Sequence, residues 1–204
     1  ITVLRDASAA AIYGTNAANG VVLITTKRGG KGSPSFEYTG TVSSSSITRR
    51  PSMLTAGKFR SAVHQYDADN GTTYTSQLLN ANTDWFGAID RTGYGQEHTF
   101  AVSGAGQNNS YRLSGNYLDQ NGILQGTTTR RISLGVTYNQ QLFDDRVTVR
   151  ANLRGSRAQD DFTPGGVLGN ATVYGPTQPI FDTATATGYY DWSGGLNSAD
   201  NPVA

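Results

Sequence analysis

The chain has 204 residues and a formal net charge of +1, with 25 glycines, 11 tyrosines and no cysteine. The near-neutral charge gives no support for nucleic acid as a partner, and the lack of cysteine excludes disulfides and thiolate metal sites. No stretch reaches the roughly 20 consecutive apolar residues of a membrane-spanning helix. The negative mean hydropathy would favour a soluble protein, but the strands of a membrane barrel alternate between lipid and lumen and also average out as polar.

A helix, a turn and a strand are predicted in residues 6–26. Asp6 can cap a helix with its carboxylate, and the alanine-rich run after it favours helix until Gly14 ends it. Asn19-Gly20 predicts a tight turn. The aliphatic and β-branched run over residues 21–26 predicts a buried strand, because it is too short for a buried helix. These residues define a shape without an activity.

A second helix is predicted over residues 54–66, in a long connection that follows a strand near residues 36–42. Phe59, Ala62, Val63 and Tyr66 recur at helical spacing, and Thr55 can cap the start. The apolar stripe of this helix is expected to pack on another apolar surface. A helix that lies on the rim of its own protein is favoured over one that binds a partner.

Four further segments alternate with a period of two and predict strands with one apolar and one polar face. They cover residues 97–104, 111–117, 131–139 and 147–154, with Phe100, Leu113, Leu134 and Val149 among the apolar positions. A soluble β-sandwich would show the same alternation. The connections favour a barrel. Short turns at 104–109 and 141–145 fall at one end of the strands, and long connections at 45–96, 119–129 and beyond 157 fall at the other end. Outer-membrane barrels have this asymmetry of short periplasmic turns and long external loops. Tyr111, Tyr117 and Tyr138 lie near strand ends, where the aromatic girdles of barrels are found.

Residues that could support catalysis do not group. His64 and His98 are far apart in sequence, and the adjacent pairs Asp144-Asp145 and Asp160-Asp161 point to opposite faces in a strand or into solvent in a turn. Residues 29–32 lack the spacing of a phosphate-binding loop. The sequence therefore predicts no enzyme, no cofactor and no metal site.

Residues 1–27 resemble the end of the plug domain in the SusC/RagA family of TonB-dependent outer-membrane transporters. The resemblance rests on Asp6-Ala-Ser-Ala-Ala-Ala-Ile-Tyr-Gly14 and Asn19-Gly-Val-Val-Leu-Ile-Thr-Thr-Lys27, with departures at Arg5 and Thr15-Asn16. Its signature positions are Asp6, Ala7, Ser8, Tyr13, Gly14, Asn19 and Gly20. Asn82-Thr-Asp-Trp85, Val102-Ser-Gly104, residues 111–123 and 170–182, and Asn201-Pro202 are similar to the first barrel strands and external loops of the family.

The resemblance implies a mostly β fold. Residues 1–32 would form the C-terminal part of an α/β plug domain, and residues 33–204 about the first five antiparallel strands and the external loops of a large, here incomplete, transmembrane barrel. It also implies TonB-dependent import of oligosaccharides or peptides across the outer membrane of a Gram-negative, Bacteroidota-like cell. The implied partners are a SusD-like lipoprotein lid, the TonB complex and membrane lipid. The signal peptide and the TonB-contacting segment are expected in a preceding part of the protein.

Two groups of candidate side chains follow from this interpretation, one facing the lumen of the barrel and one in an external loop. Salt bridging to the plug is favoured over substrate contact for the arginines on the polar faces of the strands, Arg112, Arg131, Arg150 and Arg154. The last external loop holds aromatic residues that would stack on sugars, cover a partner lid or pack on one another: Tyr174, Tyr189, Tyr190 and Trp192. Two alternatives stay open, a TonB-dependent siderophore or cobalamin receptor and a secreted β-sandwich that binds or cleaves glycans.

Overall fold

The computed structural model describes residues 2–4, 14, 20–24, 32–192 and 199–204. The chain divides into two compact units, of which one comprises residues 1–38, 100–115 and 134–155 and the other residues 39–99, 116–133 and 156–204. Five of the signature positions, Asp6, Ala7, Ser8, Tyr13 and Asn19, lie outside the described residues, as does the helix predicted after Asp6.

A two-stranded antiparallel sheet precedes the main sheet. β1 (Thr2–Leu4) pairs with β2 (Val21–Leu23), with Thr2 opposite Leu23. The strand predicted from Val21 is confirmed in its first three residues, and Gly20 has the positive φ of 101° that suits the predicted turn. The expected burial is wrong, since Val22 is 59% and Leu23 42% exposed. A two-stranded ribbon supplies no second layer that would cover its own faces.

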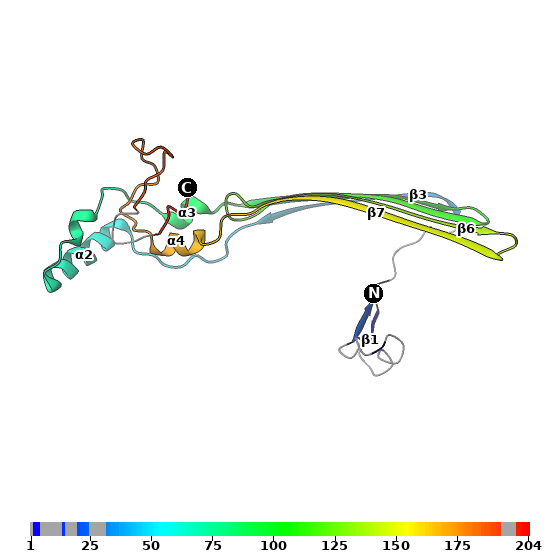
Figure 1. The fold of residues 1–204 in the computed structure, drawn as a ribbon, viewed down its shortest axis with the longest axis horizontal. Helices are drawn as coiled ribbons and strands as arrows, with labels where there is room; N and C mark the ends of the chain where they lie inside the picture. The colour runs from blue at the N-terminus through cyan, green and yellow to red at the C-terminus, as the bar shows by residue number, and fades with distance from the viewer. Residues whose placement is uncertain (1, 5–13, 15–19, 25–31, 193–198) are drawn as a thin grey trace. The chain divides into compact units, whose positions relative to one another are not determined.

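The main sheet has five strands in the order β3-β4-β5-β6-β7, so every strand pairs with its neighbour in sequence (Figure 1). The sheet is antiparallel and open. Its strands are β3 (Gly32–Ser45), β4 (Gly93–Ala105), β5 (Asn109–Asn121), β6 (Thr128–Leu142) and β7 (Val147–Asp161). They confirm the predicted strands and are longer, at 13 to 15 residues each.

The connections alternate between the two ends of this meander. Residues 106–108 and 143–146 form short turns at one end, and residues 46–92 form a long connection at the other. The long connection predicted over residues 119–129 is wrong, because β5 and β6 extend into it and leave only residues 122–127 between them. Backbone ladder bonds continue through polar residues such as Asp119, which side-chain alternation does not mark.

Four helical segments lie in the connections: α2 (Ala56–Asn70), the 3₁₀ helix η2 (Tyr74–Gln77), α3 (Trp85–Ile89) and α4 (Val167–Val173). The predicted cap of α2 is confirmed, since the Thr55 hydroxyl accepts a bond from the Lys58 amide at 3.5 Å. The predicted apolar stripe is only partly covered: Tyr66 stays 52% exposed and stacks on Tyr74 of η2. None of the helices in the described part of the chain is long and apolar enough to span a membrane.

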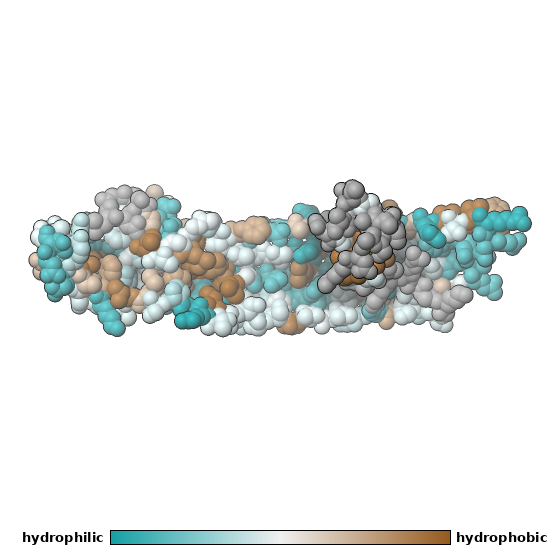
Figure 2. All heavy atoms as spheres, turned by 90° about the horizontal axis from the view of Figure 1, so that it is seen from below, coloured by the Kyte–Doolittle hydropathy of each residue, from teal (hydrophilic) through white to brown (hydrophobic). Residues whose placement is uncertain are grey.

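The hydrophobic core lies in the loops. Its buried members are Trp85, Phe86, Ile89, Ala171 and Tyr174, contributed by α3 and by α4 with its C-cap. In the five strands, by contrast, the large apolar side chains are open to the surroundings. The hydrophobic patches seen in Figure 2 lie mainly toward the left-hand side and at the right-hand end of that view. The apolar side chains of the strands therefore form no buried core that would stabilise the sheet.

Candidate functional site

The two faces of the main sheet differ in chemistry and in exposure. On the apolar face Phe36 is 72%, Leu113 51%, Leu134 62% and Leu153 69% exposed. A β-sandwich would bury these residues under a second sheet at about 10 Å. The described part of the chain places no such sheet over Leu134, which does not fit the β-sandwich alternative.

The polar face is held by bonds between side chains of different strands. Arg112 on β5 forms an ion pair with Glu37 on β3, with 3.1 Å between Nη2 and Oε2. This pair reaches across β4, where Ala101 on the same face is 1% exposed and small enough to leave it room. The Asn116 amide donates to Glu97 and Thr99 on β4 at 2.8 and 2.9 Å.

The four candidate arginines therefore do not form one group. Arg112 is paired with Glu37 and its side chain is only 17% exposed, whereas Arg131, Arg150 and Arg154 lie exposed on β6 and β7. A partner for Arg112 within the sheet was not predicted, because Glu37 is 75 residues away in sequence. Plug or cargo contact by the other three stays a prediction.

Asn82-Thr-Asp-Trp85 joins the long connection to the last loop. Thr83 donates from its hydroxyl to the Gln178 carbonyl at 2.6 Å and from its amide to the Pro176 carbonyl at 2.9 Å. Asp84 caps α3 by accepting the Gly87 amide at 3.0 Å. The Trp85 indole donates to the Gly175 carbonyl at 3.0 Å. Each of the last three residues of the motif thus has a structural role.

The aromatic candidates surround this motif. Tyr174 is 2% exposed and meets both Trp85 and Trp192 edge-on, at centroid distances of 4.8 and 5.4 Å. Burial raises the pKa of Tyr174 to about 12, and the neighbouring charges of Tyr190 and Asp191 add to this effect. Its hydroxyl donates to the Tyr190 carbonyl at 3.3 Å. Tyr174 is consequently part of the loop core.

Tyr189, Tyr190 and Trp192 lie nearer the surface than Tyr174. All three are half-buried, and Tyr189 packs on Phe181 at a centroid distance of 5.5 Å. Phe181 itself is 64% exposed. The structure brings Tyr174, Tyr190 and Trp192 together and places Tyr189 in a separate pair. The proposed contact of these residues with cargo remains a prediction.

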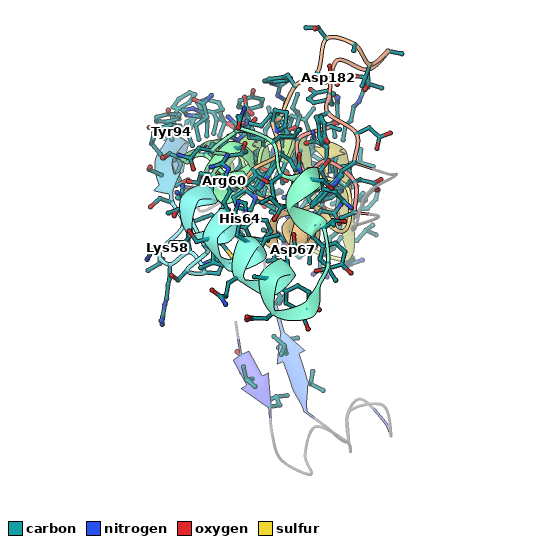
Figure 3. The ribbon with its side chains drawn as sticks, turned by 90° about the vertical axis from the view of Figure 1, so that its left-hand side faces the viewer. Lys58, Arg60, His64, Asp67, Tyr94 and Asp182 are labelled. Carbon is teal, nitrogen blue, oxygen red and sulfur yellow. The ribbon has the colours of Figure 1, made fainter. Side chains whose placement is uncertain are left out.

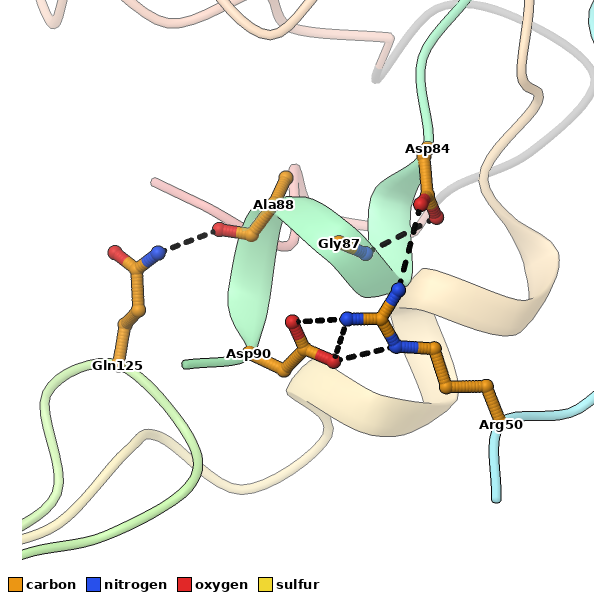
Figure 4. A network of polar contacts seen from close by, with 6 residues as sticks. All are labelled: Arg50, Asp84, Gly87, Ala88, Asp90 and Gln125. Atoms are coloured by element: carbon orange, nitrogen blue, oxygen red, sulfur yellow. Dashed lines mark hydrogen bonds and ion pairs between the residues drawn. The ribbon is translucent and has the colours of Figure 1, made fainter. Parts of the chain in front are cut away.

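A network centred on Arg50 was missed in the sequence. Its guanidinium donates to both carboxylate oxygens of Asp90, at 2.6 and 2.7 Å, and lies 3.7 Å from Asp84 (Figure 4). Gln125 from the connection between β5 and β6 joins α3 at the Ala88 carbonyl, 2.9 Å away. Arg50 and Asp90 are 40 residues apart and belong to no local pattern, so only the fold reveals them.

Helix α2 carries polar side chains along its length, among them Lys58, Arg60, His64 and Asp67 (Figure 3). The Arg60 guanidinium donates to the Leu79 and Ala81 carbonyls, each at 2.8 Å. Partial burial would raise the pKa of the Asp67 carboxyl, but hydrogen bonds from Thr72, Thr75 and Tyr74 outweigh it and hold the pKa well below the usual range. These bonds fix the turn between α2 and η2.

Groups of acidic, histidine or cysteine side chains that could hold a metal ion are absent from the described residues. What the geometry defines is a segment of a large antiparallel sheet, apolar and open on one face, polar and cross-linked on the other, with interlocked loops at one end. Large membrane barrels are built from sheets of this class.

Comparison with known proteins agrees with this class. The TonB-dependent receptor SusC of Bacteroides thetaiotaomicron is 34% identical over 100% of this chain and 22% of its own length. The TonB-dependent receptor P3 of Formosa agariphila is 32% identical over 99% of the chain and 20% of its own length. No family model matches the chain. The chain thus spans about a fifth of the length of these relatives.

The solved RagAB peptide importer, in its 'closed-closed' state, shows the same fold. It superimposes with a TM-score of 0.74 at 23% identity, over 98% of this chain and 27% of the solved one. The chain belongs to the SusC/RagA family of TonB-dependent receptors.

Proposed function

We propose that the receptor carrying this chain imports oligosaccharides or peptides across the outer membrane of a Gram-negative, Bacteroidota-like cell, with energy from TonB. The observation that carries this proposal is the open apolar face of the sheet, with Leu134 at 62% exposure in the middle of β6. Contiguous apolar surface of this extent is rare in soluble proteins and marks contact with a membrane or another protein. The full-length relatives are TonB-dependent receptors.

In this proposal residues 1–32 are the end of the plug and residues 33–204 the first strands and external loops of the barrel. The apolar face meets lipid, and the polar face with Arg112 lines the lumen. The outer edges of β3 and β7 pair with further strands, because an unpaired strand edge in lipid would leave amides and carbonyls without partners. The loops around Trp85 form part of the external surface that receives cargo.

A SusD-like lipoprotein is the proposed partner on this external surface. RagAB is described as a peptide importer, which supports peptides as one class of cargo. Oligosaccharides remain the other class that membership of the family suggests. The chemistry is transport, in which no bond of the cargo is broken.

Uptake by intact cells tests the proposal. A strain that lacks the receptor should lose uptake of a labelled oligosaccharide pool or of a labelled peptide pool, and a plasmid copy should restore it. A protonophore should abolish the restored uptake, because TonB draws on the proton gradient. Loss of ferric-chelate or cobalamin uptake instead would replace this proposal by the siderophore or cobalamin receptor. Unchanged uptake of all pools would refute import.

A further inference from the structure

The segment from Ser46 to Thr55, which we call the strap, links β3 to α2 and belongs to neither. All its residues are exposed except Ile47, which is half-buried. Among the described residues, positions 46–54 form no backbone hydrogen bond to another loop. Backbone bonding and burial therefore contribute little to holding the strap in place.

Two hollows border the strap, one along residues 50–55 and the other along residues 46–50. One is a cavity of about 410 Å³ walled by strap residues on one side, among them Met53 and Leu54, and by Trp85, Phe86 and Ala171 on the other. The second is a hollow of about 470 Å³ between residues 46–50 and residues 90–92. Because strap residues line these hollows and are mostly exposed, side-chain packing contributes little to holding the strap, and its position depends on specific bonds.

Arg50 supplies those bonds. Its two-pronged contact with Asp90 is the charge-assisted, planar geometry that makes arginine–carboxylate pairs strong. The Asp90 side chain is 8% exposed, so water screens this pair less than a surface pair. The contact to Asp84 is longer, at 3.7 Å, and that side chain is 71% exposed, so it contributes little.

Asp90 is itself firmly placed. Its amide donates to the Phe86 carbonyl at 3.1 Å at the end of α3, and its backbone pairs with Leu124 of the neighbouring connection. The fixed partner is thus the carboxylate on the loop core, and the movable partner is the guanidinium on the strap (Figure 4).

We propose that Arg50 is a latch that holds the strap as the outer wall of the 410 Å³ cavity. Release of Arg50 from Asp90 lets the strap swing away and opens the apolar side of the cavity, at Trp85, Phe86 and Ala171, to solvent. Arg50 acts here as a positioning residue, because it orients the strap and forms no part of the cavity's aromatic wall. The inference concerns the loops alone and does not rest on the proposed function.

Thiol labelling tests the latch in the full receptor. This chain has no cysteine, so once any cysteine elsewhere in the receptor is replaced by serine, Ala171→Cys gives a single reporter at a cavity-lining position that is 1% exposed. In this background, Arg50→Ala should raise the labelling rate with a small water-soluble maleimide by about tenfold or more, the scale of one charge-assisted hydrogen bond. Arg50→Lys keeps the charge without the fork and should give an intermediate rate.

Two controls separate a latch from general loosening. Arg49→Ala removes the neighbouring exposed arginine and should leave the rate unchanged. A reporter at the exposed Ala62 of α2 should label equally fast with and without Arg50. Equal labelling of Ala171→Cys with and without the Arg50→Ala substitution would overturn the proposal, as would an equal acceleration by Arg49→Ala. Should Arg50→Ala fail to fold, the comparison of Arg50→Lys with the parent decides in the same way.

Discussion

Replacing Leu134 by arginine tests whether the apolar face of the sheet meets lipid. Leu134 lies at the middle of β6 and is 62% exposed, with its Cδ2 atom 3.6 Å from the position that a Cβ on Gly115 would occupy. A residue at mid-strand in a barrel lies near the centre of the bilayer. An arginine there costs about 2–4 kcal/mol, which lowers the folding equilibrium by roughly 30- to 700-fold.

The neighbouring position gives the matched control. Ser133 points to the polar face, where its hydroxyl donates to Ser156 at 3.2 Å. Ser133→Arg places the same charge on the polar side and should cost no more than about 1 kcal/mol, the scale of one lost neutral hydrogen bond. The difference between the two variants therefore isolates the effect of the lipid from the effect of the added side chain.

The assay is folding of the full receptor into lipid vesicles across a urea series, read by the shifted mobility of unheated samples in gels. We expect the midpoint of Leu134→Arg to fall well below that of Ser133→Arg. If the apolar face met water, Leu134→Arg would be an ordinary surface substitution and would change stability by only about 0.5 kcal/mol. Equal midpoints for the two variants, or a receptor that folds in buffer without lipid or detergent, would refute the reasoning.

Three further predictions concern stability. Gly93→Ala should destabilise the receptor by about 2 kcal/mol or more, because the new Cβ would lie 2.5 Å from the Asn121 carbonyl oxygen. The control Gly155→Ala meets nothing within 4 Å and should change stability by no more than about 0.5 kcal/mol. Similar urea midpoints for the two variants would contradict this prediction. Asp145→Gly should stabilise the receptor by about 0.5–1 kcal/mol, because position 145 has a φ of 67° in the turn closed by residues 143–146. A urea midpoint lower than that of the parent would contradict the strain inferred for this turn. The phenol of Tyr174 has a pKa near 12 in the folded state against 10.0 ordinarily, so the unfolded chain loses this proton first and stability should fall as the pH rises from 10 to 12. Tyr174→Phe should flatten that fall in a pH series of urea midpoints, and an unchanged slope would show that Tyr174 titrates normally.

The amino-acid pattern alone predicted the strands and their faces. Alternation around Leu113 and Leu134 depends only on the period-two geometry of a strand, so it was readable without the fold. The Thr55 cap and the turn after β6 are also local, since their bonds join residues three apart. The family was recognisable because its signature is a continuous stretch of residues.

The tertiary structure decided what joins the loops and what is exposed. Trp85 and the Gly175 carbonyl are 90 residues apart, and Arg50 and Asp90 are 40 apart, so no spacing rule relates them. The sequence left open whether the loop aromatics meet cargo or a lid or pack on one another, and the burial of Tyr174 against Trp192 is visible only in the fold, because burial depends on which distant elements pack around a residue. Likewise, alternation cannot tell a lipid-facing strand from a sandwich strand. Only the exposure of Leu134 in the assembled sheet separates the two.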